Sequence, residues 1–246
     1  MDYKNIVVLT GAGISAESGI PVFRSETGLW ENHRIEDVCV PAALVRNPKL
    51  VHDFYNGMRR SLKDKKPNPA HFALAKLQKE WTAKGGTVTL VTQNIDDLHE
   101  KAGSTGIIHM HGELNSIWCT ACNRRFPYFE DSTPESVCPY CGKKALRPDI
   151  VFFEETPYRL DEITRALNRC DLFLSIGTSG VVYPAAAFCQ YAGARGAQCI
   201  EFNLDVSAGA AYFDYGLYGK ASETLPRFVD ELVEKGTLLR PQSWQG

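Results

Sequence analysis

The chain has 246 residues, of which 44% are hydrophobic and 23% charged, and its formal net charge is −2. This composition is typical of a globular protein with one sizeable core and a small accessory module. A protein that binds nucleic acid mainly through charge would be more basic, so nucleic acid is not an expected partner. No apolar run approaches the roughly 18–20 residues of a membrane helix, and the first residues lack a signal-peptide pattern, so we expect a cytoplasmic protein.

Short apolar runs alternate with amphipathic segments along the chain. Between the runs, apolar stripes predict helices over Pro69–Trp81 and Pro226–Glu234, the second with its proline near the start. The runs themselves are nearly continuous in Val, Ile and Leu, as in parallel strands covered on both faces. They span Asn5–Thr10, Thr87–Thr92, Asp171–Ile176 and Cys199–Asn203. The alternation predicts a doubly wound α/β fold with a parallel sheet.

A glycine-rich turn follows the first predicted strand. Residues 11–16 read GAGISA and fit G-x-G-x-x-(G/A), the turn that brings backbone N–H groups to a dinucleotide pyrophosphate. A turn that only joins a strand to a helix has the same pattern, but the position at the first strand favours nucleotide binding. The acidic residue that usually holds the adenosine ribose is not evident on the second strand, which argues against an ordinary dehydrogenase.

The segment from about 112 to 150 breaks this rhythm and carries two CxxC pairs. Cys119 and Cys122 form the first pair, Cys138 and Cys141 the second, and 15 residues separate them. This spacing matches a structural zinc ribbon, in which four thiolates leave no open position on the metal. The alternatives are two redox pairs or thiols that only pack, and a ribbon can also bind nucleic acid. The remaining cysteines lie in apolar contexts that predict core or pocket positions: Cys39, Cys170, Cys189 and Cys199.

Four stretches together resemble the sirtuin family. They are the glycine turn with its continuation Ser18–Arg24 (SGIPVFR), Thr92–His99 (TQNIDDLH), His111-Gly112 before the first CxxC pair, and Gly177–Ser179 followed by Asn203 and Asp205. Their order and spacing match the family from about residue 4 to 235. The compact length resembles a prokaryotic single-domain member.

The resemblance implies two domains. A Rossmann-like domain that binds NAD would comprise residues 1–29, 69–112 and 150–246. A small domain would combine a helical insertion, residues 30–68, with the zinc ribbon, residues 113–149. NAD, as co-substrate, and an acyl-lysine peptide would meet in the cleft between them, and the four cysteines would bind one structural Zn²⁺.

The resemblance also implies a reaction, the NAD-dependent removal of acyl groups from protein lysines. The products would be nicotinamide, O-acyl-ADP-ribose and free lysine. Asn94 and Asp96 resemble the pair that holds the nicotinamide amide and orients the ribose. His111 resembles the general base that takes a proton from a ribose hydroxyl. The alternative is that these are turn residues and an ordinary histidine, the interpretation that we give to His99 and His109.

Further residues would contact NAD by the same match. Phe23 would shield the reacting ribose, Thr178 and Ser179 would bind phosphate or ribose, and Asn203 would bind the adenosine ribose. The full predicted set is Gly11, Ala12, Gly13, Phe23, Arg24, Gln93, Asn94, Asp96, Gly177, Thr178, Ser179, Asn203 and Ala221. A strand after Gly177 that includes Val181 and Val182 would pair with the substrate backbone.

The predicted acyl pocket departs from the branch of the family that removes succinyl and malonyl groups. That branch has a Tyr-x-x-Arg pair that grips the acyl carboxylate, and a small Ala upstream. Here the pair is Tyr55 and Met58, and Cys39 stands at the position of the Ala. Arg59 is the next residue, but one residue corresponds to a turn of about 100° around a helix. It should therefore not occupy the position of the missing arginine. Because a thioether suits an apolar pocket, we expect mainly deacetylation, with desuccinylation, demalonylation or long-chain deacylation as alternatives.

A second departure lies at residues 152–155, which read FFEE. Phe153 is a predicted substrate contact, and Glu154 replaces a glycine that would let the substrate strand come close. This replacement suggests the hypothesis that substrates with basic residues near the lysine are favoured.

Two other function classes stay open. A protein ADP-ribosyltransferase would use the same NAD chemistry but would leave ADP-ribose on protein. A non-catalytic NAD-sensing zinc-ribbon regulator would bind NAD without cleaving it and would have no use for a general base. The expected partners are acylated lysine-containing proteins or peptides, with no nucleic acid and no membrane, and we expect a monomer.

Overall fold

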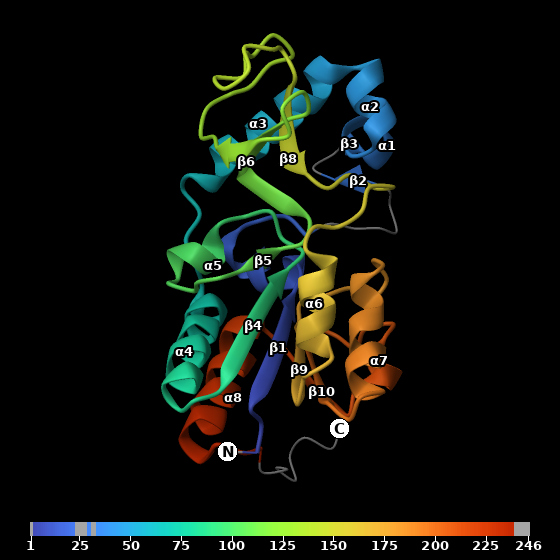
Figure 1. The fold of residues 1–246 in the computed structure, drawn as a ribbon. Helices are drawn as coiled ribbons and strands as arrows, with labels where there is room; N and C mark the ends of the chain where they lie inside the picture. The colour runs from blue at the N-terminus through green and yellow to red at the C-terminus, as the bar shows by residue number, and fades with distance from the viewer. Residues whose placement is uncertain (1, 23–28, 31–32, 239–246) are drawn as a thin grey trace.

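The computed structural model describes residues 2–22, 29–30 and 33–238, and its larger part is built on a six-stranded parallel sheet (Figure 1). The strand order is β11-β10-β9-β1-β4-β5, and every neighbouring pair is parallel. The strands are β1 Asn5–Thr10, β4 Thr87–Thr92, β5 Ile108–His109, β9 Leu172–Ile176, β10 Gln198–Asn203 and β11 Tyr215–Tyr218. The order reverses between β1 and β9, which is where doubly wound sheets bind their ligands. The predicted fold class is confirmed.

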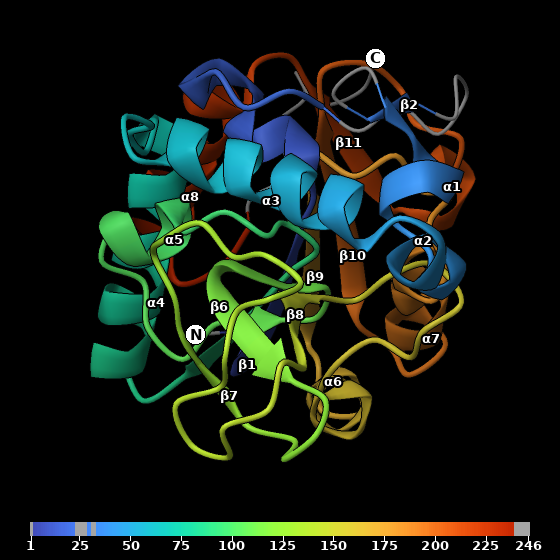
Figure 2. The same cartoon turned by 90° about the horizontal axis from the view of Figure 1, so that it is seen from above.

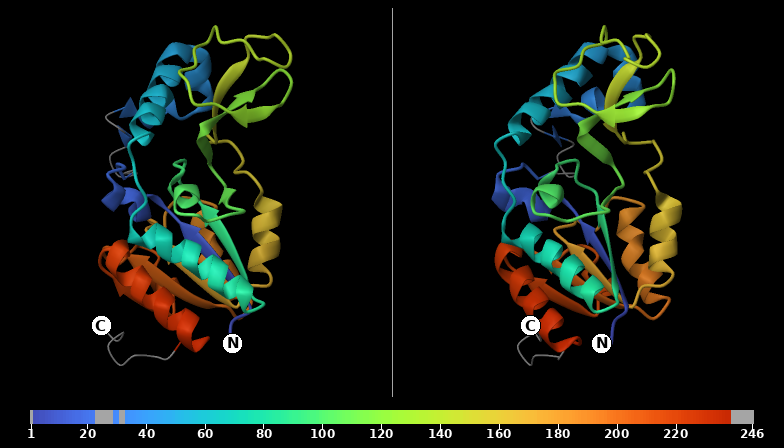
Figure 3. Two further views of the ribbon diagram at one scale, coloured as in Figure 1. Left: turned by 90° about the vertical axis from the view of Figure 1, so that its left-hand side faces the viewer. Right: turned by 60° about the vertical axis from the view of Figure 1, so that its left-hand side comes forward.

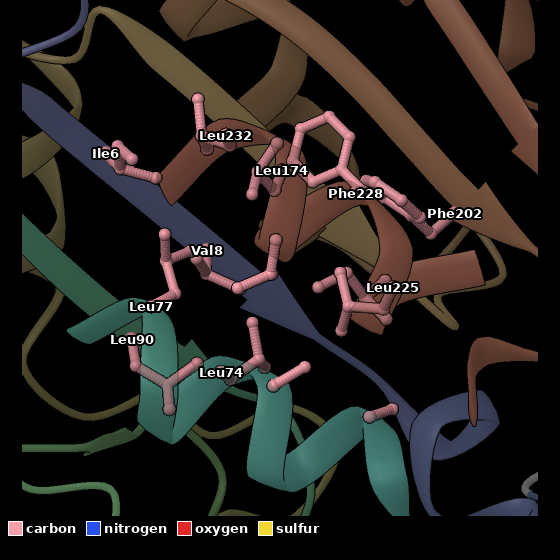
Figure 4. Close-up of a cluster of buried hydrophobic side chains, with 14 of the residues drawn as sticks. Ile6, Val8, Leu74, Leu77, Leu90, Leu174, Phe202, Leu225, Phe228 and Leu232 are labelled. Atoms are coloured by element: carbon pink, nitrogen blue, oxygen red, sulfur yellow. The ribbon is translucent and has the colours of Figure 1, made fainter. Parts of the chain in front are cut away.

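Helices cover both faces of this sheet (Figures 1 and 3). α4 (Pro69–Ala83) and α8 (Ala221–Lys235) cover one face, and α6 (Leu160–Leu167) and α7 (Phe188–Gly193) cover the other. The side chains of β1 alternate between the two layers. Ile6 and Val8 pack with α4 and α8 (Figure 4), whereas Val7 and Leu9 pack with α6 and α7. Burial on both faces explains why the strand is an unbroken apolar run.

The two predicted helices are present, with one boundary corrected. α4 follows Asn68, whose side chain accepts a hydrogen bond from the Ala70 N–H. α8 begins at Ala221, so Pro226 lies inside the helix and not near its start. The proline forfeits one backbone hydrogen bond, but the helix survives because its apolar stripe is buried. The buried residues of that stripe are Leu225, Phe228, Val229 and Leu232.

A small lobe lies beyond the carboxyl ends of the sheet strands (Figures 1 and 2). It combines three helices with an antiparallel sheet of order β7-β6-β8. Its elements are α1 Ile35–Val38, α2 Pro41–Arg46, α3 Pro48–Leu62, β6 Gly112–Cys119, β7 Arg125–Pro127 and β8 Leu146–Ile150, with the pair β2 Leu29–Trp30 and β3 His33–Arg34 beside them. α3 packs on the ribbon through Phe54, Leu62 and Leu114, which share one apolar cluster.

Short elements complete the chain. They are the 3-10 helices η1 Ala12–Ser18, η3 Ala185–Ala187 and η4 Ala210–Tyr212, and α5 Leu98–Lys101. Within the described residues, no helix is both long enough and apolar enough to span a bilayer.

Candidate active site

A cavity of about 530 Å³ lies where the loops after β1, β4 and β9 meet α3 and the segment after β8. Most predicted site residues line it: Gly11, Ala12, Cys39, Met58, Gln93, Asn94, Asp96, His111, Phe153, Gly177, Thr178, Ser179 and Val182. Five other predicted NAD or substrate contacts do not line it: Gly13, Tyr55, Val181, Asn203 and Ala221. Phe23 and Arg24 lie outside the described residues. The cavity therefore sits at the reversal point of the sheet.

The glycine turn is locked against the loop after β9. The Gly13 N–H donates to the Gly177 carbonyl at 2.9 Å. A Cβ added to Gly11 would lie 2.7 Å from the Gly177 oxygen, and one added to Gly13 would lie 2.6 Å from the Gly177 Cα. No side chain fits at either position. Gly13 thus holds the two loops together, while Gly11 and Ala12 present the turn to the cavity.

Asn203 and Ala221 lie outside the cavity, and Asn203 has a structural partner of its own. The Asn203 amide donates to the Thr178 carbonyl at 2.8 Å, so it supports the loop after β9 from behind. Ala221 begins α8, where the neighbouring Ser222 N–H donates to the Glu17 carboxylate at 3.1 Å.

Asn94 and Asp96 are held by one buried serine. The Ser15 hydroxyl donates to Asp96 Oδ2 at 2.9 Å and lies 3.3 Å from the Asn94 amide nitrogen. The same amide nitrogen donates to the Gly11 carbonyl at 3.0 Å, and Asp96 Oδ1 accepts from the Leu98 N–H at 3.0 Å. Burial raises the pKa of the Asp96 carboxyl. The two side chains are fixed before any ligand binds, as positioning of a substrate requires.

His71 supports this network, a role that the sequence analysis did not predict. Its Nδ1 accepts from the Asn68 N–H at 3.3 Å, so the proton is on Nε2, which lies 3.4 Å from the Ser15 hydroxyl oxygen. Burial lowers the pKa of His71 to about 4, so the ring is neutral near pH 7. The Asn-x-x-His spacing indicates a capped helix start. The contact of His71 with Ser15 depends on the tertiary structure and cannot be predicted from this local pattern.

His111 is prepared to accept a proton. Its Nδ1 lies 3.2 Å from the Gln93 carbonyl oxygen, and because a carbonyl only accepts, Nδ1 carries the hydrogen. Nε2 therefore has a free lone pair on a side chain that lines the cavity. Gly112 follows at φ 87°, and a Cβ there would lie 2.0 Å from the Asp149 oxygen. This contact explains why glycine must follow the histidine.

The environment of His111 predicts the acid limit of activity. Burial lowers the pKa of His111 from 6.5, although the Gln93 hydrogen bond opposes the shift. As the predicted general base, His111 would work in its neutral form, so kcat/KM should stay level as the pH falls and decline only below 6.5. A pH–rate profile at low substrate concentration measures this limit. A profile that falls to half of its maximum at pH 6.5 or above would contradict the role of His111 as the general base.

His109, to which the sequence analysis assigned no role, lies between α5 and the backbone of Asn94. Its Nε2 is 2.7 Å from Glu100 Oε1, and its Nδ1 is 3.4 Å from the Asn94 carbonyl oxygen. Burial would lower the pKa of His109, but the hydrogen bond and charge of Glu100, helped by Glu113, raise it. The imidazole therefore links α5 to the Asn94 backbone.

The predicted acyl-pocket residues separate in the structure. Met58 is half-buried on α3 and lines the cavity, as does Cys39. Tyr55 is fully buried, stacks on Phe152 with ring centroids 5.9 Å apart, and packs in the same apolar cluster as Cys39. Arg59 turns into the small lobe, where its Nε donates to the Leu114 carbonyl at 2.6 Å. Neither the tyrosine hydroxyl nor the arginine lines the cavity.

The predicted strand after Gly177 is not formed. β9 ends at Ile176, and residues 177–184 run as an irregular loop. The Val182 carbonyl accepts from the Ala186 N–H at 2.9 Å, so the backbone is turned into η3. Val181 is 47% exposed and does not line the cavity. The continuous Val-Val pattern favoured a strand, but the following turn overrides it.

The four ribbon cysteines meet in a single cluster. Their sulfur atoms all lie within 4.8 Å of one another. Cys119 and Cys141 have sulfurs 3.7 Å apart, and Cys122 and Cys138 have sulfurs 3.8 Å apart. Two thiolates bound tetrahedrally at about 2.3 Å from one zinc ion lie about 3.8 Å apart. These distances fit four ligands of one metal and exceed the roughly 2.05 Å of a disulfide.

Known proteins with the same features identify the class. The Sir2 family model matches residues 11–184. The chain is 52% identical over 238 residues to an NAD-dependent protein deacylase of Vibrio parahaemolyticus, covering 96% of this chain and 98% of that protein. It is 50% identical over 235 residues to an NAD-dependent protein deacylase of Bdellovibrio bacteriovorus, covering 94% and 98%. A crystal structure of a Sir2 homologue with NAD has a TM-score of 0.85 at 40% identity, covering 96% and 91%.

The chain therefore belongs to the Sir2 family, the sirtuins. It is an NAD-dependent protein lysine deacylase, and its protein substrates carry acylated lysines. Of the function classes that the sequence left open, this is the one that the relatives support.

Proposed function

We propose that this deacylase acts mainly on acetyl-lysine, accepts longer aliphatic acyl groups, and removes succinyl and malonyl groups weakly. The observation that carries the proposal is the direction of two neighbouring side chains on α3. Met58 lines the cavity, whereas Arg59 is 2% exposed and bound to the Leu114 carbonyl. Arg59, the cation nearest to Met58 in sequence, is thus bound within the small lobe and does not face an acyl group in the cavity.

Tyr55 and Cys39 support the same conclusion. The tyrosine ring is fully buried in the apolar cluster that also contains Cys39 and does not line the cavity, so it does not offer a donor to an acyl carboxylate there. An acidic acyl group beside Met58 would lose its hydration without gaining a charged partner. The absent charge-assisted hydrogen bond costs about 1.5–3 kcal/mol, or about ten- to a hundredfold in kcat/KM. An acetyl or butyryl group has no such cost.

Lys65 is the cation that lines the cavity in the described part of the chain. It lies three residues beyond the end of α3 at Leu62. Its ammonium lies 3.0 Å from the position of a Cβ on Gly19, beside the loop after η1.

The catalytic roles follow from the fixed side chains. NAD, when bound, supplies an electrophilic ribose carbon and the nicotinamide leaving group. Asn94 and Asp96 would hold the nicotinamide amide, and Gly11, Ala12, Thr178 and Ser179 would face the phosphates and riboses. The neutral Nε2 of His111 would take the ribose hydroxyl proton, since its Nδ1 is occupied by Gln93. Ser15 keeps the Asn94–Asp96 pair oriented.

The ribbon cysteines would hold one structural zinc ion. Four thiolates complete a tetrahedral shell, so the metal would have no open position for substrate. Its contribution would be to fix β6 and β8, which carry His111 into the cavity and lead to Phe153.

The acyl preference is tested with Met58→Arg and one peptide carrying acetyl-, butyryl- or succinyl-lysine. Mass spectrometry follows O-acyl-ADP-ribose formation for each peptide. The wild type should prefer acetyl and butyryl over succinyl by at least about tenfold, and Met58→Arg should raise kcat/KM for succinyl by at least about tenfold. Met58→Leu is the matched apolar control and should keep the wild-type order. Efficient desuccinylation by the wild type, or no gain in a folded Met58→Arg protein, would overturn the proposal.

A further inference from the structure

Two adjacent glutamates lie after β8, and their environments differ. Glu155 is bound by Arg147, with Oε1 and Oε2 at 2.6 and 3.0 Å from the guanidinium nitrogens, and it also accepts from the Phe152 N–H at 2.8 Å. Glu154 is exposed and lines the cavity. Within the described part of the chain, it has no ion pair or hydrogen bond. Both glutamates line the cavity, but the charge of Glu155 is paired with Arg147, whereas Glu154 presents a carboxylate that is unpaired among the described residues.

The direction of Glu154 is set by the backbone around it. Its φ is 76°, a left-handed conformation that residues other than glycine rarely adopt. The conformation is imposed from both sides. The Phe153 N–H donates to the Cys39 carbonyl at 3.0 Å, and the Glu155 N–H donates to the Phe152 carbonyl at 3.0 Å. With its flanking residues fixed, Glu154 remains at the cavity wall despite the unfavourable φ.

Two exposed aromatic side chains line the same cavity as Glu154. Phe153 is 40% exposed and Tyr183 is 71% exposed, and both line the cavity with Glu154. A lysine or arginine side chain has an apolar stem and a charged end, so it can cover an aromatic surface while its cation meets a carboxylate. An acidic side chain at the same place would meet a like charge.

We propose that Glu154 is a specificity-determining residue that selects acyl-lysine peptides with a lysine or arginine within two residues of the acyl-lysine. The proposal rests on the placement of the peptide beside Phe153. Glu154 acts on encounter and binding, so its effect falls on KM and on kcat/KM, and it weakens with added salt.

Three acetyl-lysine peptides of equal length test this role, with the flanking positions basic, neutral or acidic. At low ionic strength the wild type should show kcat/KM in the order basic, neutral, acidic, with about three- to tenfold between neighbours. Glu154→Gln should reduce the basic-to-neutral ratio to about one. Glu154→Lys should reverse the order, because the new charge attracts the acidic peptide.

Glu234→Gln is the matched control, since Glu234 is an exposed carboxylate on α8 that does not line the cavity. It should keep the wild-type ratios. Turnover of the neutral peptide reports on the deacylase itself, so a lost preference and a lost activity are read separately. A wild type with equal kcat/KM for all three peptides, or a Glu154→Gln variant that keeps the wild-type ratios, would overturn the proposal.

Discussion

His111→Asn should lower kcat for deacetylation by about 10²–10⁴-fold, the usual contribution of a general base. The asparagine amide can still donate to the Gln93 carbonyl, which His111 Nδ1 reaches at 3.2 Å, but it offers no basic nitrogen to the cavity. Folding and nucleotide binding should therefore be kept while proton transfer is lost. Single-turnover kinetics on an acetyl-lysine peptide measures the loss, and calorimetric titration with ADP-ribose measures binding.

The pH dependence of His111→Asn provides a second test. Residual activity in His111→Asn should no longer decline on the acid side, because the titrating ring is gone. A variant within tenfold of the wild type, or one that keeps the same acid limb, would show that another group removes the proton.

Cys138→Ser should unfold the ribbon and abolish activity. Cys138 is 1% exposed in the cluster with Cys119 and Leu146, so the change removes a ligand from the centre of the lobe. Zinc contributes on the order of 10–16 kcal/mol to zinc-finger peptides, which is comparable to the whole stability of a typical domain. We expect one zinc per wild-type chain and none in the variant, with a lower Tm and faster proteolysis of residues 112–150.

Cys170→Ala is the control for the loss of a buried thiol. Cys170 is 6% exposed in the core beneath α6 and α7, away from the ribbon. This variant should keep its zinc and most of its activity, with the modest destabilisation of a small core cavity. A zinc-free Cys138→Ser protein with wild-type Tm and activity would show that the tetrad is not a structural metal site.

The parts of the fold that could be predicted are those in which local pattern and burial agree. β1 is apolar from Ile6 to Leu9 because helices cover both faces of the sheet, so the apolar run marks the extent of the strand. The metal site could be predicted from the CxxC pairs because a zinc ribbon requires particular residue types at a fixed spacing. The glycine turn could be predicted for a similar reason, because the close approach of two backbone segments leaves no room for side chains.

The parts that could not be predicted depend on contacts between distant segments. His71 meets Ser15 across 56 positions, and neither local sequence contains that information. Tyr55 has the residue type of a pocket lining, yet packing against Phe152 removes it from the cavity. The start of α8 could not be predicted from local propensity, which places a proline at the start of a helix. A proline inside a helix is tolerated only where tertiary burial compensates for the lost hydrogen bond.

The place of β1 in the sheet has a consequence for synthesis on the ribosome. β1 pairs with β4 on one side and with β9 on the other, and Gly13 reaches the Gly177 carbonyl only after β9 has been made. At about 5–20 residues per second, the first strand waits on the order of ten seconds or more for its second neighbour. During that interval its free edge needs protection from other nascent chains, and NAD cannot assist folding until most of the polypeptide has emerged.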